Sequence, residues 1–198
     1  MGRPRQYDQR IATALLDTAE RIVAEGGLEA LSVRHVAGAI GASTRAVYSL
    51  FGSKDGLIIA LGTRAFNLLS DGLDSLPTTD DPTEDLVQAG VVVFRRFTLS
   101  HPALFMIGFL QRGVPAEIAR EFRSAQEQAL AYLHARIRRL KQVRRLGPRS
   151  EAQAAVAFHA LCEGLAALEG RCILGPDEAE HMWRDALRAL VLGWATKE

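Results

Sequence analysis

The sequence predicts an all-α protein, and three observations lead to this expectation. Apolar residues recur at intervals of three and four through most of the 198 residues, which is the spacing of one helix face. Strict alternation of apolar and polar residues, the pattern of a half-buried strand, forms no convincing run. Glycine, proline and residues that cap helices interrupt the helical pattern at intervals that suit helix ends.

The first 53 residues predict three helices. Apolar positions within residues 11–23 share one face of a first helix, which the glycines at 26 and 27 end. Ser32 is expected to cap a short second helix and Ser43 a third, with Gly41 in the turn between them. Two short helices joined by a glycine-containing turn are the sequence pattern of a helix-turn-helix.

The remaining residues predict six more helices. One runs over residues 54–75 and is followed by a linker, LPTTDDP, over residues 76–82. The five after the linker are expected to start at Asp81-Pro82, His101-Pro102, Gly113-Val114-Pro115, Ser150 and Gly175-Pro176, and to end near Ser100, Gln111, Val143, Ile173 and Ala195.

Composition excludes several classes of protein. Apolar residues make up 48% and charged residues 24%, as in ordinary globular domains. No apolar run approaches the ~20 residues of a membrane span, and no apolar stretch follows the basic N-terminus, so we expect a cytoplasmic protein without membrane contact. Cys162 and Cys172 lie ten residues apart in one predicted helix. That spacing puts them about 15 Å apart, too far for a disulfide.

The informative segment is residues 31–57, LSVRHVAGAIGASTRAVYSLFGSKDGL. In the second of its two short helices, Val47, Leu50 and Phe51 are expected to face the protein interior. The outer face then carries, among others, Arg45, the one long donor that could reach guanine O6 and N7 together. Hydroxyls at the helix N-terminus suit a phosphate, and the small side chain of Ala46 lets the helix enter a major groove.

These considerations predict a set of DNA contacts on the second and third helices and at the start of the fourth. The predicted contacts are Ser32, Arg34, Ser43, Thr44, Arg45, Ala46, Tyr48, Ser49 and Lys54. Arg3 and Arg5 could form an arm along the DNA, although a solvated tail explains them equally well. The net charge of the chain is only +1, so bulk charge does not itself argue for nucleic acid.

The segment resembles the DNA-binding domain of the tetracycline-repressor (TetR) family. The matching positions are Ser32, Ala37, Gly41, Ser43, Tyr48, Phe51, Lys54 and Leu57. The resemblance implies a ligand-responsive regulator, a repressor by default, that binds a double-stranded DNA operator as a homodimer. It also implies that Tyr48 and Lys54 contact phosphates. On this basis residues 1–53 are predicted to bind DNA and residues 54–198 to bind an effector and dimerise, with helix 54–75 as the connector.

Two sites are predicted in the second domain. The predicted effector pocket is lined by Phe94, Phe97, Leu104, Phe105, Phe109 and Phe122, and its scarcity of charge favours an apolar or weakly polar effector. A plain hydrophobic core explains each of these residues equally well. The predicted dimer interface uses Leu161, Leu165, Leu168, Trp183, Leu187, Leu190 and Trp194, which form apolar stripes on the last two helices.

Other patterns are weaker. Residues 136–149 carry seven basic residues and no acidic one, which favours a solvated helix end over a second nucleic-acid surface. His159, Cys162 and Glu163 share a helix face, where packing is favoured over a metal site. The sequence has no glycine-rich phosphate loop, nucleophile elbow or acid/base set, so we expect neither an enzyme nor a cofactor. A helical adaptor that binds protein rather than DNA is the alternative function.

Overall fold

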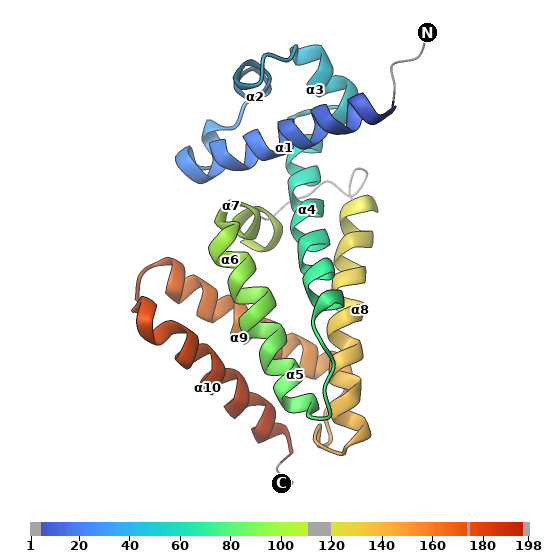
Figure 1. The fold of residues 1–198 in the computed structure, drawn as a ribbon, viewed down its shortest axis with the longest axis vertical. Coiled ribbons are helices and arrows are strands. Elements are labelled where there is room, and N and C mark those ends of the chain that lie inside the picture. The colour runs from blue at the N-terminus through green and yellow to red at the C-terminus, as the bar shows by residue number, and fades with distance from the viewer. Residues whose placement is uncertain (1–4, 111–119, 174, 196–198) are drawn as a thin grey trace. The chain divides into compact units, whose positions relative to one another are not determined.

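The computed structural model describes residues 5–110, 120–173 and 175–195, and within them it contains helices and no β-strand (Figure 1). This confirms the all-α prediction. In chain order the elements are α1 (Arg5–Gly26), η1 (Leu28–Ala30), α2 (Val33–Ala39), α3 (Thr44–Phe51), α4 (Lys54–Ser75), α5 (Pro82–Gln88), η2 (Ala89–Arg95), α6 (Arg96–Ser100), α7 (Pro102–Phe105), η3 (Met106–Leu110), α8 (Arg120–Gln142), α9 (Glu151–Gly170) and α10 (Pro176–Trp194).

Local capping signals placed several helix starts correctly. Asp81 caps α5 by accepting a hydrogen bond from the Thr83 backbone N–H at 3.0 Å, and Pro82 occupies the first helical position. Ser150 caps α9 by accepting from the Gln153 N–H at 3.1 Å. The Gln153 side chain accepts the Ser150 N–H in return, which makes a complete capping box.

Two helical segments have a hydrogen-bond pattern that the sequence did not predict. The predicted helix from 82 to 100 is continuous, but its middle, η2, is a π-helix, and η3 is a second one. The predicted helix start at Gly113-Val114-Pro115 lies outside the described residues. π-helices depend on how a helix packs against its neighbours, and residue periodicity therefore gives no signal for them.

The end of α9 also differs from the prediction. The helix ends at Gly170 rather than near Ile173, and Cys172 follows with a left-handed backbone (φ 56°). Cys162 is buried inside α9, whereas Cys172 is exposed beyond it, and both are free thiols. The two cysteines therefore do not lie in one helix, as the sequence had suggested.

The chain divides into two compact units. Unit 1 comprises Met1–Phe66 with His101–Ala125, and unit 2 comprises Asn67–Ser100 with Gln126–Glu198. α4 and α8 each contribute residues to both units. The contact-based division thus groups a segment of the predicted effector domain, 101–125, with the first three helices.

In unit 1, α1 packs against α2, α3 and α7. Its buried face consists of Leu15, Thr18, Ala19, Ile22 and Val23. Charged contacts on another side of α1 join it to the other helices of the unit: Arg64 of α4 lies 2.5 Å from Asp17, and His101 lies 2.6 Å from Glu20. α1 is therefore held from both its apolar and its acidic sides.

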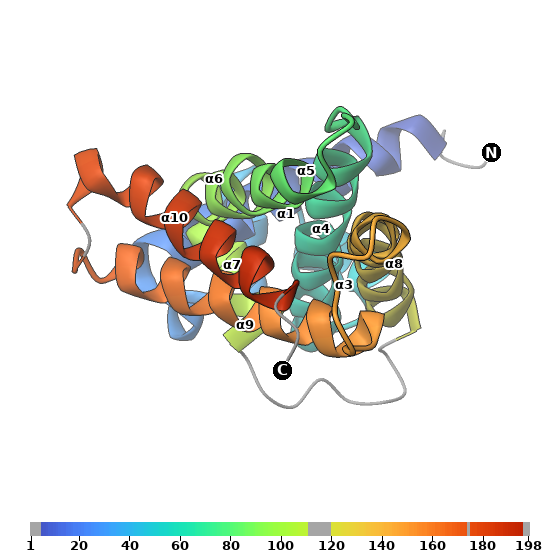
Figure 2. The same cartoon turned by 90° about the horizontal axis from the view of Figure 1, so that it is seen from below.

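In unit 2, α9 and α10 lie side by side and both contact η2 (Figures 1 and 2). A Cβ atom at Gly90 of η2 would lie 2.4 Å from Leu187, so the glycine permits this close approach. Glu169 ties the three elements together. It accepts hydrogen bonds from Arg95 of η2 at 2.8 Å and from the Trp183 indole of α10 at 2.9 Å.

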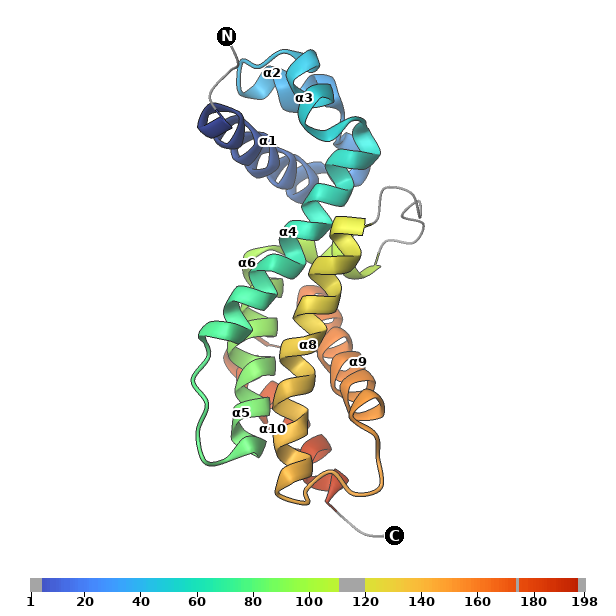
Figure 3. The same cartoon turned by 90° about the vertical axis from the view of Figure 1, so that its right-hand side faces the viewer.

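Figure 3 shows the linker that joins α4 to α5. A buried carboxylate fastens this linker to α8. Asp85 is 2% exposed and accepts hydrogen bonds from the Thr79 backbone N–H at 3.0 Å and the Thr79 hydroxyl at 2.7 Å. Arg139 of α8 donates to the same carboxylate. Burial by itself would raise the pKa of Asp85, but the bonds from Thr79 and Arg139 outweigh it and hold this pKa below its ordinary value.

The basic stretch 136–149 is therefore only partly a solvated helix end. Arg136 is buried and donates to the backbone carbonyls of Leu73 and Leu76 at the end of α4, at 2.9 and 2.7 Å. Arg138 pairs with Glu151 at 3.3 Å. The interpretation as solvent-facing charge is therefore wrong for Arg136, which is buried. The sequence pattern could not reveal this, because its acceptors lie more than fifty residues away in the sequence.

We expect Asp85→Asn to lower the free energy of unfolding at neutral pH by about 2 kcal/mol, because it leaves Arg139 without its charged partner. The folded pKa of Asp85 lies below its unfolded value of about 3.9, so the stabilisation is present above that value and disappears as pH falls through the folded pKa. Urea unfolding between about pH 2 and 7 should therefore show a flatter acid profile for the variant.

Asp80→Asn is the matched control, because Asp80 is an exposed carboxylate in the same linker. It should leave both the stability and its pH dependence nearly unchanged. An acid profile of Asp85→Asn that coincided with that of the unaltered protein would contradict the proposed role of the carboxylate.

Candidate nucleic-acid interface

The helix-turn-helix predicted from the sequence is present in unit 1. α2 and α3 pack against each other and are joined by residues 40–43, where Gly41 adopts a left-handed backbone (φ 67°) (Figure 1). The Ala42 N–H donates to the Ala37 carbonyl at 2.9 Å and closes the end of α2. An L-residue other than glycine would be strained at Gly41, and this explains why the turn needs that residue.

Both predicted N-caps are formed. The Ser32 hydroxyl accepts the His35 N–H at 3.1 Å, and the Ser43 hydroxyl accepts the Ala46 N–H at 3.2 Å. Each hydroxyl keeps its own proton as a donor. At the start of α3 the backbone N–H groups of the first turn point out of the helix end, where they favour an anion.

The outer face of α3 has the predicted composition. Thr44, Arg45, Tyr48 and Ser49 are all exposed, and 54% of the Tyr48 surface is accessible. Val47 is fully buried behind them. Leu50 and Phe51, which were expected to be buried as well, are only half-buried because they lie on the last turn of the helix.

A second glycine turn determines where α4 starts. Gly52 ends α3 in a left-handed conformation (φ 75°) and donates its N–H to the Tyr48 carbonyl at 2.9 Å. Ser53 then caps α4 by accepting the Gly56 N–H at 2.9 Å, a cap that we did not predict. A Cβ atom at Gly56 would lie 1.8 Å from the Phe51 carbonyl oxygen, so only glycine fits there.

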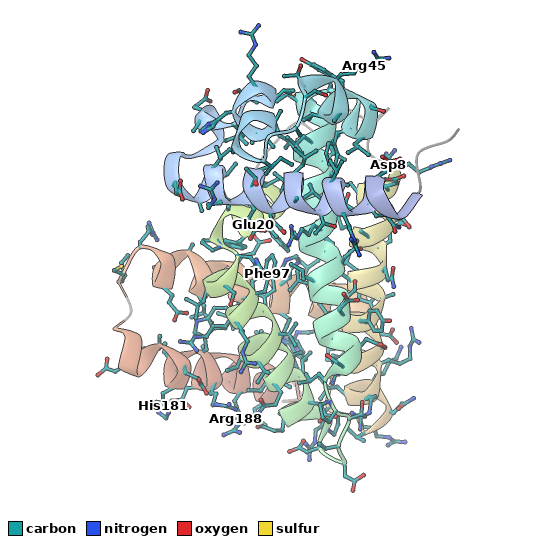
Figure 4. All side chains as sticks on the ribbon, turned by 45° about the horizontal axis from the view of Figure 1, so that its top comes forward. Asp8, Glu20, Arg45, Phe97, His181 and Arg188 are labelled. Carbon is teal, nitrogen blue, oxygen red and sulfur yellow. The ribbon has the colours of Figure 1, made fainter. Side chains whose placement is uncertain are left out.

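The other predicted contacts lie around α3. Arg34 and Lys54 are exposed, and Ala46 is half-buried. Figure 4 shows Arg45 on the outer side of α3 and Glu20 on the side of α1 that faces away from it. Arg5 is the first residue of α1 rather than part of a preceding arm, and Arg3 lies outside the described residues.

Charge is distributed unevenly over these elements. Residues 31–54, which we call the acid-free segment, contain two arginines, one lysine and no aspartate or glutamate. The acidic side chains of α1 are partly engaged elsewhere, because Asp17 pairs with Arg64 and Glu20 with His101. The exposed surface of α2 and α3 is consequently basic, although residues 1–56 as a whole are nearly neutral.

Comparison with known proteins identifies this arrangement. Residues 15–61 match the model of the bacterial regulatory proteins of the TetR family. The helix-turn-helix of this chain is thus similar to that of the TetR family. Its members are regulatory proteins, and the match covers the whole helix-turn-helix together with most of α1.

Relatives and solved structures agree with this assignment. The transcriptional regulator EthR of Mycobacterium tuberculosis and Mycobacterium bovis is 28% identical over 133 residues, which are 66% of this chain and 61% of EthR. The TetR-family regulator PfmR of Thermus thermophilus has 24% identity and a TM-score of 0.71, over 92% of this chain and 99% of PfmR.

Two further structures show the same fold at lower identity. A Rhodococcus protein of unknown function has a TM-score of 0.81 and 19% identity, over 94% of this chain and 95% of its own. FadR of Bacillus subtilis, solved with stearoyl-CoA, has a TM-score of 0.76 and 15% identity, over 91% and 98% of the two chains. At these identities the solved structures speak for the fold alone.

The predicted effector-pocket residues fall into both units. Unit 1 holds Leu104, Phe105, Phe109 and Phe122, and the rings of Phe109 and Phe122 pack against a residue that we did not predict, Phe66 of α4. The ring centroids of Phe109 and Phe122 lie 5.0 and 5.3 Å from that of Phe66. Unit 2 holds Phe97 and Phe94, the latter 6.4 Å from the ring of Trp183.

Four of the seven predicted dimer-interface residues are covered by their own chain. Leu165, Trp183, Leu187 and Trp194 have at most 7% of their surface exposed. Their apolar stripes face the core of unit 2, and their contribution to an interface stays a prediction. Leu161, Leu168 and Leu190 are half-buried, and their role at an interface stays a prediction.

The three residues of the histidine–cysteine pattern on α9, His159, Cys162 and Glu163, differ in burial. Cys162 is fully buried, and burial raises the pKa of its thiol well above the ordinary value. His159 Nε2 lies 3.2 Å from a Glu163 carboxylate oxygen on the same helix, and burial lowers the pKa of His159. Among the described residues no cluster of three or more possible ligands could hold a metal ion, and none of their helices is long and apolar enough to span a membrane.

The geometry at Gly56 gives a test of this interface. We expect Gly56→Ala to lower the free energy of unfolding by about 1–3 kcal/mol, because the new Cβ would overlap the Phe51 carbonyl oxygen and force α3 and α4 apart. Affinity for DNA should fall with it. Thermal unfolding and fluorescence anisotropy with labelled duplex measure the two effects.

Gly38→Ala is the control, because a Cβ atom on that exposed helical glycine would meet nothing within 4 Å. It should leave stability unchanged or raise it by up to about 1 kcal/mol. Equal stability of the Gly56 and Gly38 variants would show that the turn before α4 tolerates a side chain.

Proposed function

We propose that this protein is a ligand-responsive transcriptional regulator that binds a double-stranded DNA operator as a homodimer and acts as a repressor. The observation that carries the proposal is the exposed, acid-free face of α3, held by the buried Val47 within the matched TetR domain. The relatives named as transcriptional regulators support it. Operator DNA also implies a cytoplasmic location.

Within this proposal the exposed residues divide into two roles. Arg45 offers two parallel donors to guanine O6 and N7 in the major groove, and Thr44 and Ser49 lie beside it on the same face. Lys54 at the start of α4 and Arg34 on α2 bind phosphates. The first role distinguishes sequences, whereas the second adds affinity to any duplex.

We expect Arg45→Ala to reduce discrimination between operator and random DNA by about 1–3 kcal/mol, because it removes the base-reading donors. Lys54→Ala should instead weaken binding to all duplexes alike and reduce the salt dependence by about one phosphate contact. Anisotropy titrations at several salt concentrations, on a duplex selected from random DNA, would measure both.

Equal loss of operator and random binding in the Arg45 variant would contradict its base-reading role. Failure of the unaltered protein to enrich any sequence from random DNA would instead favour the alternative function, a helical adaptor.

A homodimer is proposed to form through the outer faces of α9 and α10. On α9 the exposed positions Val156, Ala160 and Gly164 are spaced four apart and share one face, and Val156 is 70% exposed. On α10, Met182 and Leu192 are 46% and 52% exposed. Small residues allow two α9 helices to approach closely, and a dimer supplies the two recognition helices that half-sites about 34 Å apart require.

We expect Val156→Glu to weaken the dimer by at least about tenfold in dissociation constant. The substitution places two carboxylates, one from each subunit, at the twofold interface, where they repel each other and lack partners. Sedimentation at micromolar concentration would measure the association. Operator binding should fall in parallel.

Val143→Glu makes the same change at a valine of similar exposure, 50%, next to the end of α8. It should leave association unaltered. A Val156 variant that sedimented like the Val143 variant would exclude this face of α9 from the interface.

The effector is proposed to be apolar or weakly polar. The aromatic cluster around Phe66 and the buried phenylalanines of η2 and α6 offer apolar surface and few charges. FadR of Bacillus subtilis, a protein of the same fold, was solved in complex with stearoyl-CoA, whose stearoyl chain is apolar and whose CoA group is charged.

A further inference from the structure

One hydroxyl on α4 behaves differently from the other two. Thr63 donates to the Ile59 carbonyl at 2.9 Å and Ser75 to the Asp71 carbonyl at 2.8 Å, each four residues back along the helix. Ser70 is 96% buried, and its oxygen has no hydrogen-bond partner among the described residues. Its hydroxyl thus lacks the bond to the helix backbone that the other two make.

One neighbour of α4 close to Ser70 in sequence is apolar. Two residues further along the helix, Gly72 allows Val93 of η2 to pack against the helix backbone, where an added Cβ would lie 2.7 Å from the valine methyl. Ser70 therefore lies on a part of α4 that packs against an apolar side chain of η2.

A second unsatisfied donor occurs on the facing helix of the same unit. Arg136 of α8 is 93% buried and donates through Nη2 to the carbonyls of Leu73 and Leu76, but its Nη1 has no partner among the described residues. Leu73 lies three residues after Ser70, so the two positions share one side of α4. Buried polar atoms are rarely left unpaired, and two in one region need an explanation.

Ser70 and Arg136 differ in their hydrogen-bonding groups, but both can donate a hydrogen bond. A guanidinium nitrogen can only donate, whereas a serine hydroxyl can donate or accept. A group that satisfies both of them must accept a hydrogen bond, and a carbonyl or carboxylate oxygen is the common acceptor of this kind. An ammonium or other pure donor would be repelled by the arginine.

From these observations we infer that Ser70 is the polar anchor of the effector site and that the effector is a largely apolar molecule with one acceptor oxygen, a carbonyl or a carboxylate. The inference rests on the proposed function, since it names the chemistry of the effector. Ser70 lies on the helix that starts at the end of the helix-turn-helix, so the anchor is part of the element that links effector and DNA contacts in sequence.

The test compares four probes of equal chain length: octane, 2-octanone, octanoate and octylamine. Calorimetric titration of the unaltered protein should give the tightest binding for 2-octanone or octanoate, and the stronger of the two tells whether the acceptor is neutral or charged. Ser70→Ala should weaken that probe about tenfold, the value of one good hydrogen bond, and leave octane unchanged.

Ser75→Ala is the matched control, because it removes an exposed hydroxyl of α4 that bonds only to its own backbone. It should not change probe binding. Without a probe, Ser70→Ala should unfold at the same or a higher temperature than the unaltered protein, since it deletes a buried hydroxyl that is unpaired.

Three results would overturn the inference: equal binding of the preferred probe to the Ser70 variant, preference for octane or octylamine, or binding of none of the four. Operator binding of each variant without a probe is measured in parallel. If the protein and its Ser70 variant both bind the operator while the probes fail, the effector chemistry is wrong and the proposed regulator stands. If neither binds DNA, the regulator itself is wrong.

Discussion

The packing of Val47 against the interior of unit 1 is the constraint on which the DNA-reading surface depends. With that side chain fully buried, the helical period of α3 turns Arg45 and Tyr48 outward, and no other rotation of the helix is available. Gly41 and Gly52, both with positive φ, set where the helix starts and ends. One buried valine and two glycine turns therefore orient the donors that a duplex would meet.

The distribution of charged residues also favours DNA binding by this surface, although the net charge of the first 56 residues does not show it. The acidic residues that bring the first 56 residues close to neutrality lie outside the acid-free segment, and two of them on α1 contact α4 and His101. They thus hold the helix that supports α3, and Glu20 lies on the side of α1 that faces away from Arg45 (Figure 4). Where charges lie decides whether a near-neutral domain can approach a polyanion.

Local features of the fold were predictable, and features that depend on distant parts of the chain were not. Caps such as Ser43 and Asp81, and the exposed face of α3, follow from a few neighbouring residues. The contact between Asp85 and Arg139 joins residues 54 positions apart. An apolar stripe such as that of Trp183 likewise does not say whether its own chain or a second copy covers it, and here it is the chain itself.

The same distinction bears on where an effector could act. Natural sequences usually satisfy each local preference, and the positions that violate one tend to be functional. Ser70 is such a position, because alanine would suit a buried helical site better than a hydroxyl that avoids the bond made by Thr63 and Ser75. The unpaired hydroxyl of Ser70 lowers the stability of the protein without ligand. The simplest reason for such a residue is that a bound molecule supplies its hydrogen-bond partner. The stability of α4 and its response to a ligand would then depend on one oxygen atom.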